Sequence, residues 1–184
     1  MQQIKGTVLK TRLAFVEEHF GGDGVRRVLD GMTPDDRQAL SMLLPVKWYP
    51  FELGKRLDDA IVRDLGGGQS TFFIRLGEAS AEKNLTTVHR GFLAPGDPHG
   101  FLAKAPVIYS LYYETGRREY LKTGEREGQL TTYDAETFSA PDCLTVMGWY
   151  RKALEMCGVK EVRINEEECR AKGGAVCRYR VTWA

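Results

Sequence analysis

The 184-residue sequence lacks any apolar stretch close to the ~20 residues that a membrane-spanning helix needs. Its first residues, MQQIKGTVLKTRL, contain no apolar run of the kind found in a signal peptide. It also lacks an excess of charge of one sign, because 26 Lys and Arg residues face 25 Asp and Glu residues. A protein that follows nucleic-acid phosphates usually shows a basic patch or stripe. We therefore expect a cytoplasmic protein with no membrane span and no nucleic-acid partner.

Repeats, low-complexity segments and linkers are also missing from the sequence. A chain of this length can bury a substantial core without disulfides or structural metals to hold it together. We therefore expect residues 1–184 to form a single domain.

The usual signs of catalysis are scarce. The three histidines, His19, His89 and His99, fall on different predicted elements, and no nucleophile accompanies them. No cofactor fingerprint is visible either. The sequence therefore predicts a protein that is not an enzyme and has no catalytic residues.

Helical signals dominate the first two-thirds of the chain. The clearest is TPDD, in which Thr33 can cap a helix, Pro34 suits its first position, and Asp35 and Asp36 suit the positive end of its dipole. Gly77, Ala79 and Ala81 would let a neighbouring helix come close. Apolar spacing and glycine stops predict helices around residues 13–20, 25–30, 34–43, 53–65, 70–85 and 97–113, the last kinked at Pro106.

The pattern changes after residue 117. REYLKTG and GQLTTYD are typical of an antiparallel pair of strands, and KEVRINEEEC and AVCRYRVTW of a second pair. Between them, SAPD begins a strong helix that ends at Gly158. The order predicts an α+β fold, with a helical N-terminal part packed on an antiparallel β-sheet.

The four cysteines include three that we expect to meet. An extra residue near Glu167 and Glu168, a β-bulge, would give the last hairpin one apolar face and turn Glu166, Cys169 and Cys177 towards it. Cys143 lies on the apolar stripe of the preceding helix, near its N-terminus. Three sulfurs and one carboxylate form a plausible tetrahedral zinc site.

Simpler roles for these residues remain open. Buried cysteines are common core residues, and the spacing is not a paired CxxC pattern. A disulfide between Cys169 and Cys177 is conceivable, although a reducing compartment disfavours it. Glu166 could instead be a solvated strand residue or an ion-pair partner of Arg178 or Arg180. Cys157, at the far end of the helix, is interpreted as a packing residue.

The C-terminal segments YYETGRREYLKTG, CLTVMGWYRKALEMCGV and ECRAKGGAVCRYRVTW carry a resemblance to a known family. They resemble the vinyl-reductase-type (4-vinyl reductase) sensor domain, in a wider group with haem nitric-oxide-binding-like domains and the TRAPP trafficking subunits. The segments IKGTVLKTRLAFVEEHFGG, WYP and MGWYRKALEMCGV are similar to a family of uncharacterised myxobacterial proteins. Together these segments extend the resemblance over nearly the whole chain.

The resemblance implies a zinc ion held by Cys143, Glu166, Cys169 and Cys177. It also implies a homodimer that binds a small hydrophobic or aromatic molecule between helices and sheet. The tyrosine-serine-arginine signature of the haem domains is absent around Tyr109 and Ser110, so no haem is expected.

Two functions follow as alternatives. The first is a non-enzymatic sensor or regulatory domain with a hydrophobic cavity and a structural zinc site. The second is a scaffold that recruits a protein partner, as the TRAPP subunits do. For a cavity lined by apolar groups and a few polar ones, the candidate ligand-binding residues are His99, Phe101, Tyr109, Tyr112 and Tyr150.

Overall fold

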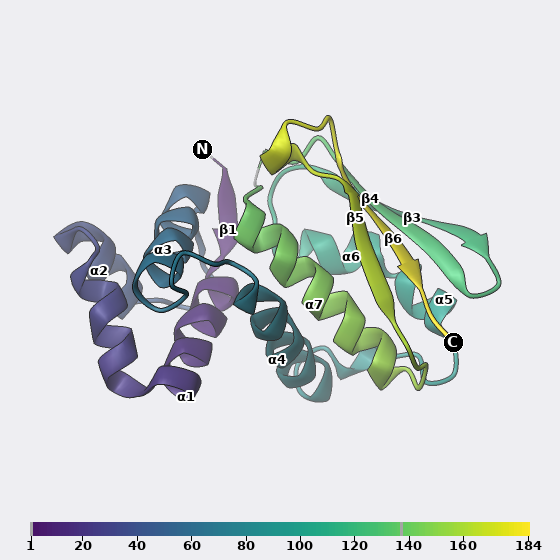
Figure 1. The fold of residues 1–184 in the computed structure, drawn as a ribbon, viewed down its shortest axis with the longest axis horizontal. Coiled ribbons are helices and arrows are strands. Elements are labelled where there is room, and N and C mark those ends of the chain that lie inside the picture. The colour runs from purple at the N-terminus through teal and green to yellow at the C-terminus, as the bar shows by residue number, and fades with distance from the viewer. Residues whose placement is uncertain (1, 137) are drawn as a thin grey trace.

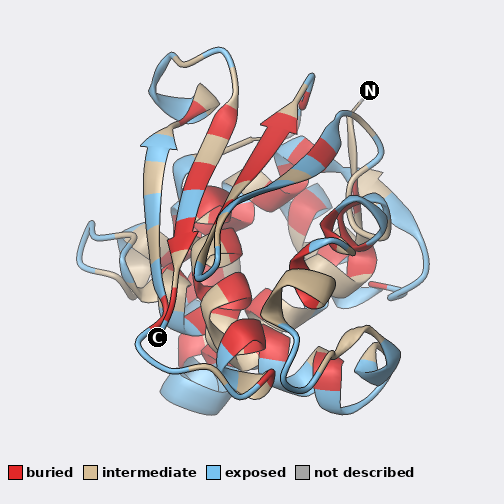
Figure 2. Ribbon diagram, turned by 90° about the vertical axis from the view of Figure 1, so that its right-hand side faces the viewer, coloured by how far each residue is buried: buried red, intermediate tan, exposed pale blue. Residues whose placement is uncertain are grey.

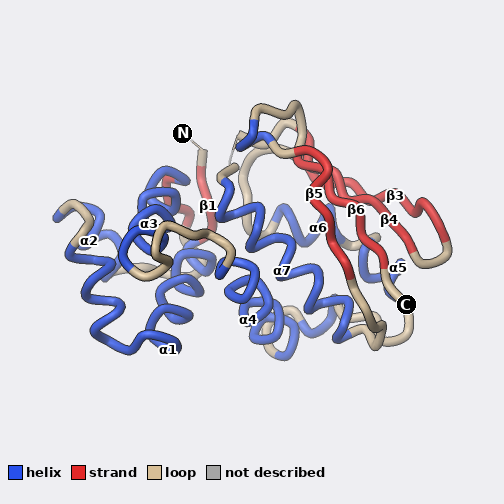
Figure 3. Tube along the Cα trace, in the orientation of Figure 1, coloured by secondary structure: helices blue, strands red, loops and turns tan. Residues whose placement is uncertain are grey.

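The computed structural model describes residues 2–136 and 138–184, and it places helices on one side and a four-stranded sheet on the other (Figure 1). Figure 3 shows the same division, with the C-terminal strands grouped at one end. Two short 3₁₀ turns lie at Arg90–Phe92 and Arg170–Lys172. The remaining elements are β1 (Gln3–Lys5), α1 (Gly6–Asp30), α2 (Pro34–Ser41), β2 (Trp48–Pro50), α3 (Phe51–Asp64), α4 (Phe72–Thr86), α5 (Pro98–Leu102), α6 (Ala105–Ser110), β3 (Arg117–Gly124), β4 (Glu127–Tyr133), α7 (Ala140–Met156), β5 (Arg163–Glu168) and β6 (Cys177–Thr182).

The sheet confirms the predicted α+β fold. Its strands are antiparallel in the order β3-β4-β6-β5, with Leu130 opposite Tyr179 and Ile164 opposite Val181. The predicted bulge is present, because the β5–β6 register shifts between Glu166 and Glu168. Alternate residues of β6 are buried, which is the pattern of a sheet with one face covered by helices.

Local signals explain the N-terminal helices. Thr33 caps α2 by accepting a hydrogen bond from the backbone N–H of Asp36 at 3.2 Å. The two helices expected before and after GGDG are both present and join in one kinked element, α1. Gly21 forms a kink there with φ 67°, a left-handed conformation that glycine adopts without a Cβ penalty.

Two features differ from the predicted elements. The expected helix over residues 97–113 is two short helices, α5 and α6. Pro106 lies in the first turn of α6, where its missing N–H costs nothing, so a new helix begins there instead of a kinked one. The sequence also gave no sign of β1, which pairs with β2 in a separate two-stranded sheet.

Buried side chains form two hydrophobic cores, one in each half of the chain. The N-terminal core lies among α1, α2, α3 and the start of α4, whereas the C-terminal core joins α4, α7 and the sheet. Figure 2 shows the buried positions concentrated on the sides where helices and sheet face each other. Within the described residues, no helix is long and apolar enough to cross a membrane.

Helices α4 and α7 connect the halves and pack backbone to backbone. A Cβ added to Gly77 would overlap the carbonyl oxygen of Thr145, and a Cβ added to Gly148 would overlap that of Ile74. The two helices can therefore lie this close only because both positions are glycine. The expected close approach at Gly77 is confirmed.

Candidate ligand-binding site

A cavity of about 60 Å³ lies where the two halves meet. Its walls come from α1, α4, α6, α7 and β3, so no single element forms it. Most of the lining is apolar, with a few polar groups among the apolar ones, as in small-molecule sites. The lining residues are Thr7, Val8, Thr11, Arg12, Leu76, Ser80, Asn84, Ile108, Tyr112, Tyr113, Arg118, Asp142, Thr145, Val146, Trp149 and Tyr150.

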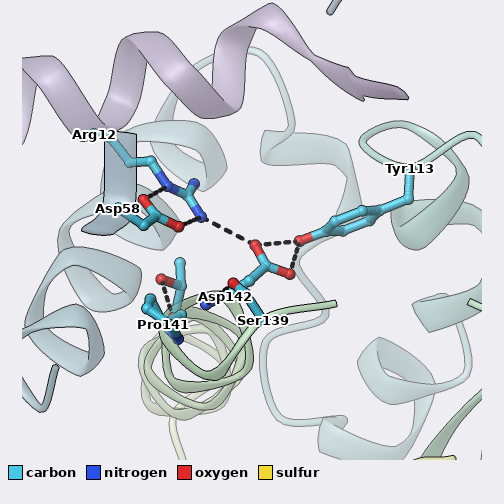
Figure 4. Close-up of polar contacts among 7 residues, drawn as sticks. Arg12, Asp58, Tyr113, Ser139, Pro141 and Asp142 are labelled. Atoms are coloured by element: carbon cyan, nitrogen blue, oxygen red, sulfur yellow. Dashed lines mark hydrogen bonds and ion pairs between the residues drawn. The ribbon is translucent and has the colours of Figure 1, made fainter. Parts of the chain in front are cut away.

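A buried polar network crosses the boundary beside this cavity (Figure 4). Arg12 of α1 donates to both carboxylate oxygens of Asp58 in α3, at 2.5 and 3.1 Å. Its Nη2 also donates to Asp142 Oδ1 in α7, at 3.0 Å. Tyr113 donates to the same Asp142 carboxylate at 2.8 Å. Arg12, Asp58 and Asp142 are only 1%, 2% and 5% exposed, so these contacts are shielded from water.

The position of Asp142 follows from the start of α7. Ser139 caps this helix by accepting a hydrogen bond from the backbone N–H of Asp142, and Pro141 occupies the first turn. A carboxylate in the first helical turn is favoured by the helix dipole. The same local signals that begin α7 therefore point Asp142 at Arg12.

Asp58 gives the network a pH dependence. Burial raises the pKa of Asp58 to about 6, although Arg12 opposes the shift. Because this value lies above the ordinary Asp value of about 3.9, the folded protein binds the proton more tightly than the unfolded chain. We expect the stability of the wild type relative to Asp58→Asn to rise as pH falls from 7 to 4, by about 2 kcal/mol.

Urea unfolding of both proteins at pH 7, 6, 5 and 4 measures this difference. All other titratable groups are present in both proteins, so their contributions cancel in the difference and only the titration of Asp58 remains. A difference in the free energy of unfolding that stays constant over this range would contradict the raised pKa of Asp58.

Arg118 of β3 is the second buried cation of the site. It is 6% exposed, and its Nε donates to Thr132 Oγ1 at 2.9 Å. Its guanidinium carbon lies 5.0 Å from the ring centre of Tyr109 and 5.5 Å from that of Tyr150. Among the ion pairs of the described residues, none includes Arg118. It thus differs from Arg12, which contacts two carboxylates.

Two further hydroxyl groups of the cavity lining are buried and have weak partners at most. Tyr112 Oη lies near the Asn84 side chain and Tyr150 Oη near the Arg118 guanidinium, and neither contact has full hydrogen-bond geometry. Burial raises the pKa of both tyrosines, which keeps their hydroxyls protonated and able to donate. An orphan buried hydroxyl is costly unless another molecule satisfies it.

Of the five predicted ligand-binding residues, two line the cavity and three do not. Tyr112 and Tyr150 line the cavity. Tyr109 lies against Arg118 beside a smaller void, and its hydroxyl donates to the carbonyl of Thr115 at 2.7 Å. Phe101 is fully buried in the C-terminal core. His99 is not among the residues that line the cavity, and its ring nitrogens are bonded to Tyr120 Oη and the Glu125 carbonyl.

Sequence reasoning missed the charged members of the site, Arg12, Asp58, Asp142 and Arg118. Each lies in a stretch where a charged residue on an exposed helix face or strand is the ordinary interpretation. The one signal was Arg12, which interrupts the apolar residues of α1 on the side that faces the core.

Three of the predicted metal-ligating residues do come together. The sulfur atoms of Cys143, Cys169 and Cys177 lie within 4.8 Å of one another, and all three residues are buried. Cys143 Sγ is 3.5 Å from Cys169 Sγ and 3.9 Å from Cys177 Sγ, so none of them is disulfide-bonded. Hydrogen bonding with Cys143 lowers the pKa of Cys177 to about 6.

The Glu166 carboxylate lies next to Cys169 but is outside the group of three sulfurs that all lie within 4.8 Å of one another. One carboxylate oxygen pairs with Lys172 Nζ, while Oε1 is buried without a hydrogen-bond partner. The structure thus brings three of the four residues together. The role of the four residues as metal ligands stays a prediction.

Comparisons with known proteins give a family and a fold. The family model described as "Protein of unknown function (DUF2378)" matches residues 13–184. Among curated proteins, none matches the chain.

The similar solved structures are H-NOX proteins. The "Fe(II) unliganded H-NOX protein from K. algicida" is 12% identical with a TM-score of 0.74, covering 98% of this chain and 96% of that one. A mutant of the T. tengcongensis H-NOX is 15% identical with a TM-score of 0.70 and 97% coverage of both chains. A structure titled "Modulating Heme Redox Potential Through Protein-Induced Porphyrin Distortion" is 14% identical with a TM-score of 0.68, covering 97% and 99%. At these identities the likeness shows the fold.

Two expectations drawn from the resemblance are wrong. The similar structures are H-NOX proteins, so the assignment to the vinyl-reductase and TRAPP group is not supported. The scaffold alternative that rested on TRAPP loses its basis with it. The cofactor prediction of zinc without haem is wrong as well, because the similar structures are described with Fe(II) and heme.

The residues around the cavity do not fit a haem in this conformation. The cavity of about 60 Å³ is far below the ~300–1,000 Å³ of sites for drug-sized ligands. Haem iron takes an axial His, Cys, Met or Tyr, and among the lining residues only tyrosines are of these types.

Proposed function

The chain belongs to the DUF2378 family and has the H-NOX fold, and from this premise we propose that it is a small-molecule sensor domain. Its ligand binds in the cavity between the two halves. The observation that carries the proposal is a mostly apolar cavity whose wall holds the buried cation Arg118, which has no carboxylate partner, and the buried hydroxyls of Tyr112 and Tyr150.

The position of the cavity supplies a way to transmit binding. Its walls belong to both hydrophobic cores, and the Arg12–Asp142 ion pair holds the halves together beside it. A ligand that binds more tightly at one spacing of the halves shifts the equilibrium between the two spacings. The free energy of that shift cannot exceed the difference in binding free energy between the two states. The domain therefore responds without performing a reaction, and we propose that it is not an enzyme.

Native mass spectrometry of the purified protein tests the sensor proposal. We expect a bound small molecule, lost from Tyr150→Trp, whose larger side chain fills the cavity. Leu121→Trp, on an exposed position of β3, is the matched control and should keep the molecule. If neither the native spectrum nor a screen of metabolites by thermal shift reveals a ligand that Tyr150→Trp excludes, the proposal fails.

Three further measurements on the same sample concern cofactors and oligomeric state. An absorption spectrum of the sample shows whether a haem accompanies the protein. Metal content, compared between the wild type and Cys169→Ser, tests whether Cys143, Glu166, Cys169 and Cys177 are metal ligands, without presupposing the ion. The mass of the native assembly tests the proposed homodimer.

A further inference from the structure

Arg118 is a permanent charge that no carboxylate of the described residues pairs with. Arginine stays protonated in proteins, so burial cannot neutralise it. Taking such a charge out of water costs several kcal/mol unless it is paired. Its Nε donates to the neutral Thr132 hydroxyl, and the neutral Tyr150 hydroxyl lies beside its guanidinium. The guanidinium instead lies on the faces of Tyr109 and Tyr150, which offset part of that cost.

The surroundings of Arg118 are otherwise suited to an anion. The cavity that it lines also contains the buried hydroxyls of Tyr112 and Tyr150, which have no well-aligned partner and can donate. The carboxylates nearby are already engaged, because Asp58 binds Arg12 and Asp142 binds Arg12 and Tyr113. Three donors that face one cavity, one of them charged, match an oxygen acceptor with negative charge.

We infer that the ligand of this domain is a short-chain monocarboxylate, which Arg118 binds through its guanidinium and Tyr112 and Tyr150 bind through their hydroxyls. This inference rests on the proposed sensor function and names its ligand class. One unpaired cation matches one negative charge. The apolar remainder of the lining, including Ile108, Val146 and Trp149, accommodates a hydrocarbon tail.

The volume of the cavity limits the length of the tail. One water molecule occupies about 30 Å³ of liquid, and an engineered cavity of about 150 Å³ holds benzene. The 60 Å³ of this cavity therefore admits a molecule the size of acetate or propionate and excludes an aromatic ring unless the halves separate.

Calorimetric titration at constant ionic strength tests the inference with acetate and propionate against acetamide and propionamide. These amides have nearly the same shape and no charge. We expect saturable binding of at least one carboxylate and none of its amide. Equal binding of acid and amide would overturn the inference, as would tighter binding of phosphate or chloride than of either carboxylate.

Variants identify the residue that binds the ligand. Arg118→Lys keeps the charge but loses the planar pair of donors, and we expect the Kd to rise about 10- to 100-fold. Tyr112→Phe removes one hydroxyl with little change of shape, and we expect a rise of about tenfold. Arg180→Lys, in the same sheet but paired with Glu127 on the surface, is the matched control and should leave the Kd unchanged. An unchanged Kd in both Arg118→Lys and Tyr112→Phe would sink the assignment.

Cys177 offers a competing counter-charge, because it lines a small void together with Arg118. If a Cys177 thiolate already balances Arg118, carboxylates will bind Cys177→Ser and not the wild type, and the inference fails. The two proposals can be told apart. A neutral molecule that occupies the cavity while carboxylates do not leaves the sensor function standing and removes only the ligand class.

Discussion

Replacing Arg12 with methionine is expected to lower the free energy of unfolding by about 3–5 kcal/mol. Methionine fills much of the same space, so the loss comes mainly from charge. Asp58 and Asp142 would remain buried next to each other without the cation that both contact. Breaking a buried ion pair by removing one partner is costly for this reason, whereas the intact pair adds little net stability.

Urea unfolding at pH 7 measures this effect, with Arg26→Met as the matched control. Arg26 pairs with Asp23 on the surface, where both side chains are largely exposed, so its loss should change stability by less than about 0.5 kcal/mol. Adding Asp58→Asn to Arg12→Met should restore part of the stability, because one uncompensated carboxylate is removed. A loss below about 1 kcal/mol in Arg12→Met would show that the two carboxylates are not buried as the structure has them.

The second large effect is expected at the crossing of α4 and α7. Gly148→Ala would place a methyl group on the carbonyl oxygen of Ile74, which belongs to a backbone that cannot rotate away. Overpacking of this kind costs about 1–3 kcal/mol, more than the ~1 kcal/mol that alanine gains over glycine in a helix. We expect a net loss of stability and a changed cavity, because Ser80 and Trp149 line it from these same two helices.

Gly22→Ala is the control for this substitution. A Cβ at Gly22 meets nothing within 4 Å, so only the helix preference of alanine should act and the variant should be as stable as the wild type or more so. Thermal unfolding of both variants gives the comparison. A Gly148→Ala variant more stable than the wild type would contradict the close approach of the two helices.

Local patterns in the sequence determined the element types in this protein. The TPDD start of α2, the SAPD start of α7 and the strand alternation of β6 are set by neighbours along the chain, so they could be predicted. The bulge in β5 also followed from sequence, because only one register gives the hairpin a common apolar face. The meeting of Cys143, Cys169 and Cys177 was a consequence of that register and of the apolar stripe of α7.

The site itself was decided by tertiary structure. Arg12, Asp58, Asp142 and Arg118 come from four elements far apart in the chain, and each alone has the sequence signature of a solvated charge. Their burial depends on how the two cores pack across α4 and α7, which no local pattern encodes. Whether a charge is paired or orphaned is a property of that packing, and so the difference between Arg12 and Arg118, on which the proposed ligand depends, exists only in the folded chain.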